Sequence, residues 1–239
     1  MINLSEDLKQ AIMAHALAES PRECCGVLVD VDGELEYVGC RNMADHPLQQ
    51  FAIHHQDYAK AEERGEIVAI VHSHPFASVE PSEADRTACE ASGMPWIIVN
   101  PQTEAMHQFA PEGHEAPLIG RTFVYGVHDC YSVIRDHYKR ELGIALPDVD
   151  REEFGWWKNG KNLYVEQFER VGFVDVHDAP RKHDCFLMQV QSNVSNHAAV
   201  YLGDNLILHH LVNQLSRRDI YGGYWMQHTS HVLRYRTLC

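Results

Sequence analysis

The stretch Ile67-Val68-Ala69-Ile70-Val71-His72-Ser73-His74-Pro75 joins a continuous apolar run to a pair of histidines. Five consecutive apolar residues are typical of a strand that is buried on both faces of a sheet. Pro75 favours a bend directly after this strand, so the imidazoles of His72 and His74 can turn toward one point. The stretch therefore predicts a buried strand that carries two candidate metal ligands at its end.

A second polar motif, Ser82-Glu83-Ala84-Asp85, follows after a short gap. Ser82 and Asp85 lie three residues apart at an expected helix start, so they share one face of that helix. Two imidazoles and one carboxylate make a three-ligand zinc set whose fourth position is left for water. The Ser82-x-x-Asp85 spacing, with Pro81 ahead of it, is also the capping-box start of an ordinary helix. The fixed offsets of all these residues after one strand favour a catalytic zinc site made by His72, His74 and Asp85.

Length and composition limit the classes of protein to consider. A chain of 239 residues fits one large or two small domains, and its formal charge of −14 argues against a broad nucleic-acid or anionic-membrane surface. No apolar run approaches the length of a transmembrane helix, and the acidic, polar first residues are unlike a signal peptide. Seven cysteines without C-x-x-C spacing indicate neither a disulfide framework nor a cysteine zinc site. We therefore expect a protein made in a cytosol, without membrane insertion or nucleic-acid partner.

The first half alternates expected strands and helices, which predicts an α/β layer domain. A charged residue, Glu23, stands at the mouth of an apolar strand, and Asp32-Gly33 is a strong hairpin signal. His54 and His55 are interpreted as helix-start histidines rather than as further metal ligands. The expected elements are helices over 5–19, 54–65 and 82–92, and strands over 34–40, 67–72 and 95–99.

Residues 1–110 resemble the JAMM (or MPN) zinc peptidases. The resemblance rests on Glu23 ahead of Cys25-Gly26, on His72-x-His74-Pro75 and on Ser82-x-x-Asp85. It implies that His72, His74 and Asp85 hold Zn²⁺, that Glu23 acts on the zinc-bound water, and that Ser82 helps to stabilise the oxyanion. Zinc lowers the pKa of bound water, and a carboxylate can then shuttle its proton, so the chemistry supports the same roles.

Residues 111–117 are polar and turn-rich, which predicts a linker before a second domain over 118–239. Near the start of this domain, Cys130 precedes an apolar stripe of helical spacing formed by Val133, Ile134, Tyr138 and Leu142. Asp129 is well placed to cap this helix. A cysteine at a helix N-terminus feels the positive end of the dipole, so we expect the pKa of Cys130 to be lowered.

Three expected strands, over 184–188, 197–204 and 206–210, follow later in the chain. A hairpin at Gly203-Asp204-Asn205 would bring His209 beside His197, which completes a set of nucleophile, base and orienting polar group with Cys130. Strand alternation sends His209 and His210 to opposite faces, so only one of them can serve, and spacing favours His209. The aromatic residues Trp156, Trp157, Tyr164 and those within 221–225 are interpreted mainly as core.

The second half resembles the NlpC-type cysteine peptidases, a papain-like family that cuts bacterial cell-wall peptides. The resemblance rests on Asp129-Cys130, on His197-x-x-x-Tyr201-Leu202-Gly203 and on His209. It implies Cys130 as nucleophile, His197 as base and His209 as the orienting residue. This chain departs from the family at Tyr131-Ser132, where Ser-Gly is usual, and at Phe123, where the family has a tyrosine near the oxyanion hole. Whether Phe123 or Tyr125 contributes to that hole stays open.

The two resemblances together predict an α+β protein of two domains, an α/β JAMM-like domain followed by a papain-like α+β domain. This pairing resembles the tail tip assembly proteins of lambda-like phages. It implies that the zinc domain processes a protein during tail maturation and that the thiol domain hydrolyses stem or cross-bridge peptides of peptidoglycan. It also implies other tail tip proteins as partners, and a location in the host cytoplasm during synthesis and at the tail tip of the virion.

Two alternatives to this bifunctional hydrolase remain. In the first, the protein is a structural tail assembly factor whose peptidase folds mainly bind partners. In the second, by analogy with other JAMM proteins, it is an isopeptidase of the ubiquitin type, although nothing in the second half supports that function. The complete set of Glu23, His72, His74 and Asp85, and that of Cys130, His197 and His209, favour the hydrolase, because a scaffold has no physical need for either.

Overall fold

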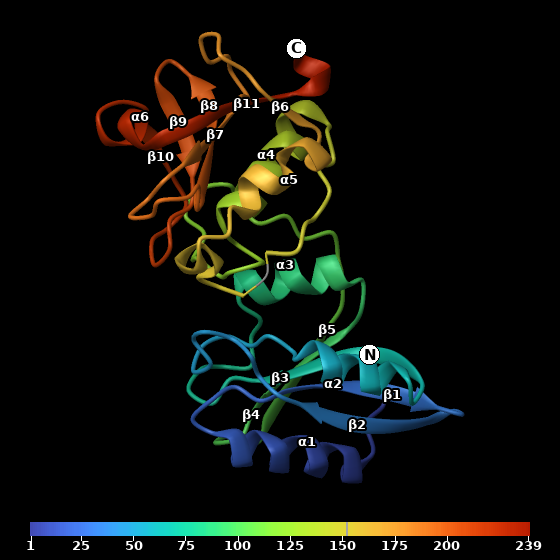
Figure 1. Ribbon diagram of the computed structural model, residues 1–239. Helices are drawn as coiled ribbons and strands as arrows, with labels where there is room; N and C mark the ends of the chain where they lie inside the picture. Colours follow the sequence, from blue (N-terminus) through green and yellow to red (C-terminus); the bar gives the residue numbers. More distant parts are fainter. Residues whose placement is uncertain (152) are drawn as a thin grey trace. The chain divides into compact units, whose positions relative to one another are not determined.

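The apolar run after Gly65 forms β3 (Glu66–Ser73), the middle strand of a five-stranded sheet with the order β2-β1-β3-β4-β5 (Figure 1). The computed structural model describes residues 1–151 and 153–239, and this sheet belongs to the first of two units, Met1–Glu115 and Ala116–Cys239. β3 pairs antiparallel with β1 and parallel with β4. The remaining pairs are antiparallel, and the other strands are β1 (Cys25–Val31), β2 (Glu34–Cys40), β4 (Trp96–Asn100) and β5 (Ala105–Phe109).

Helices cover both faces of this first sheet, which explains why its central strands are apolar on both sides. α1 (Glu6–Glu19) packs Ile12 and Ala16 onto Ala69 and Val71 of β3 and the neighbouring strands. α2 (His55–Glu62) lies on the opposite face, where its Ala61 packs with apolar residues of β1 (Figure 1). α3 (Glu83–Ser92) forms the crossover between the parallel strands β3 and β4, and its Cys89 packs beside Trp96.

The local signals for helices and turns in this unit are confirmed with one difference. Asp32 and Gly33 take positive φ angles of 54° and 90°, as a hairpin turn of the primed type requires. The predicted helix 54–65 begins at His55, with His54 as N-cap, and ends at Glu62. Gly65 therefore does not end the helix. A Cβ there would lie 2.1 Å from the carbonyl oxygen of Asp30, so this glycine marks a close approach of the chain to β1.

The second unit is built on a six-stranded antiparallel sheet with the order β10-β9-β8-β7-β11-β6 (Figure 1). The predicted hairpin joins β8 to β9, and its two loop residues, Asp204 and Asn205, have positive φ angles of 51° and 56°. The strands are β6 (Phe173–Asp175), β7 (Cys185–Met188), β8 (His197–Gly203), β9 (Leu206–His209), β10 (Arg217–Ile220) and β11 (Thr229–Tyr235).

Alternating side chains divide this sheet into two cores. One face packs Val200 and Leu208 against Val133, Ile134 and Tyr138 of α4 (Cys130–Leu142), together with residues of α5 (Leu163–Val171). The other face packs the intervening residues of the same strands against Trp225 of α6 (Tyr224–His228). Two short 3₁₀ helices, η1 (Trp156–Asn159) and η2 (Arg236–Leu238), complete the unit. No helix among the described residues is both long and apolar enough to cross a membrane.

Candidate active sites

The end of β3 and the start of α3 bring three donor groups to one point in the first unit. His72 Nε2 lies 3.1 Å from His74 Nε2 and 3.3 Å from Asp85 Oδ1, and His74 Nε2 lies 3.5 Å from Asp85 Oδ2. The structure thus brings together the three residues that the sequence predicted as metal ligands. One donor atom from each lies within 4.8 Å of the others.

The spacing of these donors fits a tetrahedral zinc ion. With metal–ligand bonds of about 2.0–2.1 Å and tetrahedral angles, two ligand atoms stand roughly 3.3 Å apart. The two imidazole nitrogens are 3.1 Å apart, and the nearest Asp85 oxygen to each, Oδ1 for His72 and Oδ2 for His74, lies at 3.3 and 3.5 Å, all close to that value. Two imidazoles and a carboxylate leave the fourth position to water or substrate, which is the arrangement of catalytic rather than structural zinc sites.

Contacts behind the two histidines fix the orientation of their rings. The carbonyl oxygen of Ser78 lies 2.7 Å from His74 Nδ1, so Nδ1 carries a proton and donates it to this carbonyl, and Nε2 is the nitrogen that would hold a metal. The His72 ring stacks on Phe51 at 4.5 Å between centroids and meets the edge of Trp96 at 5.5 Å. Both imidazoles are therefore held before any ligand binds.

Asp85 unites the two interpretations of the Ser82-x-x-Asp85 motif. Ser82 Oγ accepts a hydrogen bond from the Asp85 N–H at 3.1 Å, and Asp85 Oδ2 accepts one from the Ser82 N–H at 2.7 Å. This capping box starts α3 and at the same time aims the Asp85 carboxylate at His72 and His74. Hydrogen bonds from these imidazoles hold the pKa of Asp85 far below its usual value, although burial works in the other direction.

Glu23 lies two residues before the start of β1 and is buried, with 5% of its surface exposed. Burial raises the pKa of its carboxyl to about 8, with His74 acting against that shift and Asp85 adding to it. Its backbone is held by two hydrogen bonds, from its N–H to the Pro47 carbonyl at 2.7 Å and to its carbonyl from Asn42 Nδ2 at 2.9 Å. The charges of His74 and Asp85 therefore act on the Glu23 carboxyl.

Cys130 is the first residue of α4 in the second unit and is almost fully buried. The preceding Asp129 caps the helix: its Oδ1 accepts from the Ser132 N–H at 2.8 Å, and Ser132 Oγ receives the Asp129 N–H at 2.7 Å. The other Asp129 oxygen meets the guanidinium Nε of Arg151 at 3.0 Å, with both side chains buried. These contacts hold the N-terminus of α4, and with it the thiol, in one position.

His197 and His209 meet where β8 begins and β9 ends, with His197 Nε2 3.0 Å from His209 Nδ1. Both rings contact Trp225, at centroid distances of 6.0 and 4.7 Å. His210 lies on the other side of its strand, where it meets the ring of Phe123 and bonds the Gln214 carbonyl at 3.1 Å. Of the two histidines weighed from the sequence, the structure brings His209 to His197.

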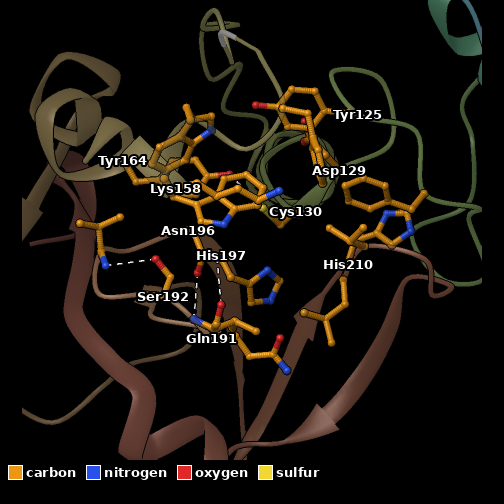
Figure 2. A pocket seen from close by; sticks show the side chains of 18 of the residues that line it. Tyr125, Asp129, Cys130, Lys158, Tyr164, Gln191, Ser192, Asn196, His197 and His210 are labelled. Atoms are coloured by element: carbon orange, nitrogen blue, oxygen red, sulfur yellow. Dashed lines mark hydrogen bonds between the residues drawn. The ribbon is translucent and has the colours of Figure 1, made fainter. Parts of the chain in front are cut away.

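A cavity of about 850 Å³ opens between these elements and is lined by Cys130, His197 and His210 (Figure 2). One wall is aromatic, and the opposite wall consists of amide and hydroxyl side chains of the loop between β7 and β8, including Gln191, Ser192 and Asn196 (Figure 2). The aromatic residues of the cavity are Phe123, Tyr125, Phe154, Trp156, Trp157, Tyr164, Tyr224 and Trp225. Trp156, Tyr221 and Trp225 are buried, as interpreted from the sequence, and Trp156 and Trp225 line the cavity as well.

The sequence predicts Tyr164 as one of the core aromatic residues, with no role in the thiol site, whereas its hydroxyl lies 3.0 Å from Cys130 Sγ. Burial raises the pKa of Tyr164 well above its usual value, so the phenol remains a hydrogen-bond donor. Of the two residues considered for the oxyanion hole, Phe123 has no hydroxyl, and the Tyr125 hydroxyl donates to the Arg151 carbonyl at 2.5 Å. No spacing rule could have found Tyr164, because it stands 34 residues after Cys130 on a different helix.

The charge state of the thiol pair differs from the prediction. Burial, followed by the Asp129 carboxylate, raises the pKa of the Cys130 thiol to about 11, against the opposing effects of Tyr164, the Ala198 backbone and Arg151. The predicted lowering by the helix N-terminus is therefore wrong for the resting site, because desolvation is the larger effect. Burial also holds the pKa of His197 well below 6.5, with His209 and His210 adding to the shift. The resting pair is a neutral thiol and a neutral imidazole.

Comparison with known proteins assigns a family to each half of the chain. The family model described as prokaryotic homologs of the JAB domain matches residues 5–111, and the NlpC/P60 family model matches residues 120–234. Tail tip assembly protein K of Escherichia phage N15 is 42% identical over 228 residues, which cover 95% of this chain and 93% of that protein. Tail tip assembly protein K of Escherichia phage lambda is 43% identical over 182 residues, covering 76% and 88%. A JAB1/MPN domain protein from Archaeoglobus fulgidus is 23% identical over 46% of this chain and 88% of its own, with a TM-score of 0.31.

Proposed function

Because this chain belongs to the family of tail tip assembly protein K, with a JAB domain followed by an NlpC/P60 domain, we propose that it is a peptide hydrolase with two separate active sites. The better supported site is the thiol centre, a cysteine peptidase that cuts stem or cross-bridge peptides of peptidoglycan. The observation that carries it is that Cys130 and His197 line one cavity while His209 hydrogen-bonds Nε2 of His197. The proposed setting is the host cytoplasm during tail assembly and the tail tip of the particle, with other tail tip proteins as partners.

The thiol site can carry out both halves of acyl transfer. His197 Nδ1 takes the proton of Cys130 as Sγ attacks the peptide carbonyl. The developing oxyanion accepts hydrogen bonds from the Tyr164 hydroxyl and from the Cys130 N–H at the start of α4. His197 then returns the proton to the leaving amine, which leaves a thioester on Cys130. In the second half His197 takes a proton from the attacking water, and the acid product departs as the thiol is restored.

A digest of purified diaminopimelate-type peptidoglycan, read by mass spectrometry, tests this function. We expect the wild type to release new peptide fragments and Cys130→Ala to release none. Cys185→Ala, which removes another buried cysteine of the same unit, is the matched control and should release the same fragments as the wild type. An absence of fragments from a folded wild-type protein would contradict the wall-cutting function and favour a structural assembly factor.

The second proposed site is a zinc-dependent peptide or isopeptide hydrolase centred on His72, His74 and Asp85. The observation that favours it is the convergence of three buried donors at the spacing that zinc requires. Bound zinc would polarise the scissile carbonyl and lower the pKa of its water. In this proposal Glu23, a buried carboxyl on which the charges of His74 and Asp85 act, would take a proton from the attacking water and pass it to the leaving amine. Ser82, next to the same point in the capping box, is the candidate hydrogen-bond donor to the oxyanion.

Metal analysis of the purified protein tests the zinc site independently of any substrate. We expect about one zinc per chain in the wild type and less than a tenth of that in His74→Ala. His54→Ala is the matched control, because His54 is a histidine of the same unit that caps α2. Equal zinc contents in all three proteins would show that the metal binds elsewhere and would overturn this assignment.

A further inference from the structure

His209, which hydrogen-bonds Nε2 of His197, can exist in two neutral tautomers, whereas an asparagine at this position would have none to choose between. Either ring nitrogen of a neutral histidine can carry the proton, so the ring can donate or accept at either position. For His197 to offer an unprotonated Nδ1 to the thiol, its Nε2 must carry the proton and donate it to His209 Nδ1, 3.0 Å away. His209 must then carry its own proton on Nε2. Another group has to favour that tautomer.

Asp219 is the group that the fold places at this nitrogen. His209 is fully buried, and among the described residues its Nε2 has no hydrogen-bond partner. Asp219 Oδ2 lies 3.7 Å from it, within ion-pair range. Asp219 stands on β10 opposite Ile207, so it reaches His209 as a diagonal neighbour on the same face of the sheet. Bonds of this kind are often long before substrate binds.

The Asp219 carboxylate is itself held in place. Its Oδ1 accepts from the Ile220 N–H at 3.0 Å, and its Oδ2 accepts from Arg217 at 3.2 Å. Although burial works in the other direction, these bonds and one from Trp225 keep the pKa of Asp219 below its usual value. The residue is therefore an anion at neutral pH, and an anion attracts the N–H rather than the lone pair of an imidazole.

Other charged and titratable groups also face His209. These are His197 from β8, His210 next in the chain and Arg217 from β10, and the Trp225 ring of α6 covers the same side. Asp219 is the one carboxylate among them. Arg217 repels a proton on His209, so it cannot select the required tautomer.

We propose that Asp219 is a positioning residue of the thiol site, whose carboxylate selects the Nε2-protonated tautomer of His209 and thereby directs the lone pair of His197 toward Cys130. The proposal rests on the assignment of His197 as the base of Cys130. It extends the site to a relay of four groups, in which the charge that forms on His197 during proton transfer is balanced through His209 by Asp219.

The test is a double-mutant cycle read by the alkylation of Cys130 with iodoacetamide between pH 5 and 9, with mass spectrometry assigning the labelled peptide. Asp219→Asn should lower the rate at neutral pH by about tenfold, and Asp219→Glu should restore at least half of it. In a His209→Asn background, where no tautomer needs to be set, Asp219→Asn should change the rate less than twofold. Arg218→Gln, an exposed change on the same strand, is the control for the fold of β10 and should leave the rate unchanged.

Two results would overturn the proposal. The first is an equal loss from Asp219→Asn with and without His209, which would mean that Asp219 only supports the fold of β10. The second is an unchanged alkylation profile in Asp219→Asn. Alkylation needs no wall substrate, so the cycle can succeed even if the peptidoglycan digest fails. In that case the proposed substrate is wrong and the positioning role stands.

Discussion

The Tyr164 hydroxyl, 3.0 Å from Cys130 Sγ, is the proposed hydrogen-bond donor to the oxyanion. Removing this one oxygen atom tests the proposal. Tyr164→Phe should lower kcat on a wall peptide by about a hundredfold with little change in KM, because a preorganised donor acts mainly in the transition state. Tyr125→Phe is the control, since its hydroxyl is already committed to the Arg151 carbonyl, and kcat should stay within about threefold. A larger loss in Tyr125→Phe than in Tyr164→Phe would contradict the assignment.

The lowered pKa of His197 fixes the acid limb of the pH–rate profile. A base whose pKa is lowered stays unprotonated to more acidic pH, so kcat/KM should remain level from pH 8 to 7 and fall only below about pH 6.5. Steady-state rates over pH 4–9 measure the limb. An acid limb centred at or above pH 7 would contradict the account, because burial, His209 and His210 all lower the pKa of His197.

At the residue scale, the sequence located those groups whose spacing is imposed by one element or one turn. His72 and His74 follow from a strand end, Ser82 and Asp85 from a helix start, and His209 from a hairpin that returns to His197. Tyr164 and Asp219 reach the thiol site from two other elements, α5 and β10, and no motif around either residue indicates a role in that site. The predicted lowering of the Cys130 pKa was wrong, because burial raises this pKa and the position of a residue on a helix does not reveal how deeply it is buried.

At the scale of elements, the buried ion pair between Arg234 and Asp184 links β11 to the turn before β7. Arg234 holds Asp184 by two bonds, of 2.9 Å from Nε and 2.8 Å from a terminal nitrogen, and both side chains are at most 4% exposed. Arg234→Ala should lower the free energy of unfolding of the second unit by about 3–5 kcal/mol, because it leaves a carboxylate buried without its cation.

Denaturant unfolding followed by tryptophan fluorescence measures this loss, since three of the four tryptophans, Trp156, Trp157 and Trp225, lie in the second unit. Arg236→Ala, which removes an exposed guanidinium bonded to the Glu169 carbonyl, is the control and should cost less than about 1 kcal/mol. A loss below that of the control would show that the pair contributes nothing to stability.

Elements with strong local signals were predictable, and the strands β6, β10 and β11 were not. The helix over 82–92 has a capping box and Gly93 with φ of 67°, and both hairpins have turn residues suited to positive φ. The strands β6 and β10, three and four residues long, and the seven-residue β11 have no clean alternation. β6 and β11 form by pairing with strands distant in sequence, and β10 forms by pairing with β9 at the edge of the sheet. Their existence depends on the sheet, so the local sequence could not indicate them.

At the scale of the whole chain, each unit has its own sheet and its own hydrophobic cores. The predicted α+β pairing of a JAMM-like domain with an NlpC-like domain is confirmed by the two family models and by the relatives that extend over both halves. The division between the units falls after Glu115. The sequence could predict this organisation because each half carries its own motif set. It could not predict the substrate of the zinc site, because no local motif identifies that substrate.

One measurement tests the central claim of two separate hydrolase centres most directly: the release of peptides from peptidoglycan by four preparations of the full chain. These are the wild type, the wild type stripped of metal by a chelator, Glu23→Gln and Cys130→Ala. We predict the same fragments from the first three and none from Cys130→Ala, because Cys130 and its base lie in a unit that holds none of the predicted metal ligands. Fragments that persist in Cys130→Ala, or that disappear when the metal is removed, would contradict the claim.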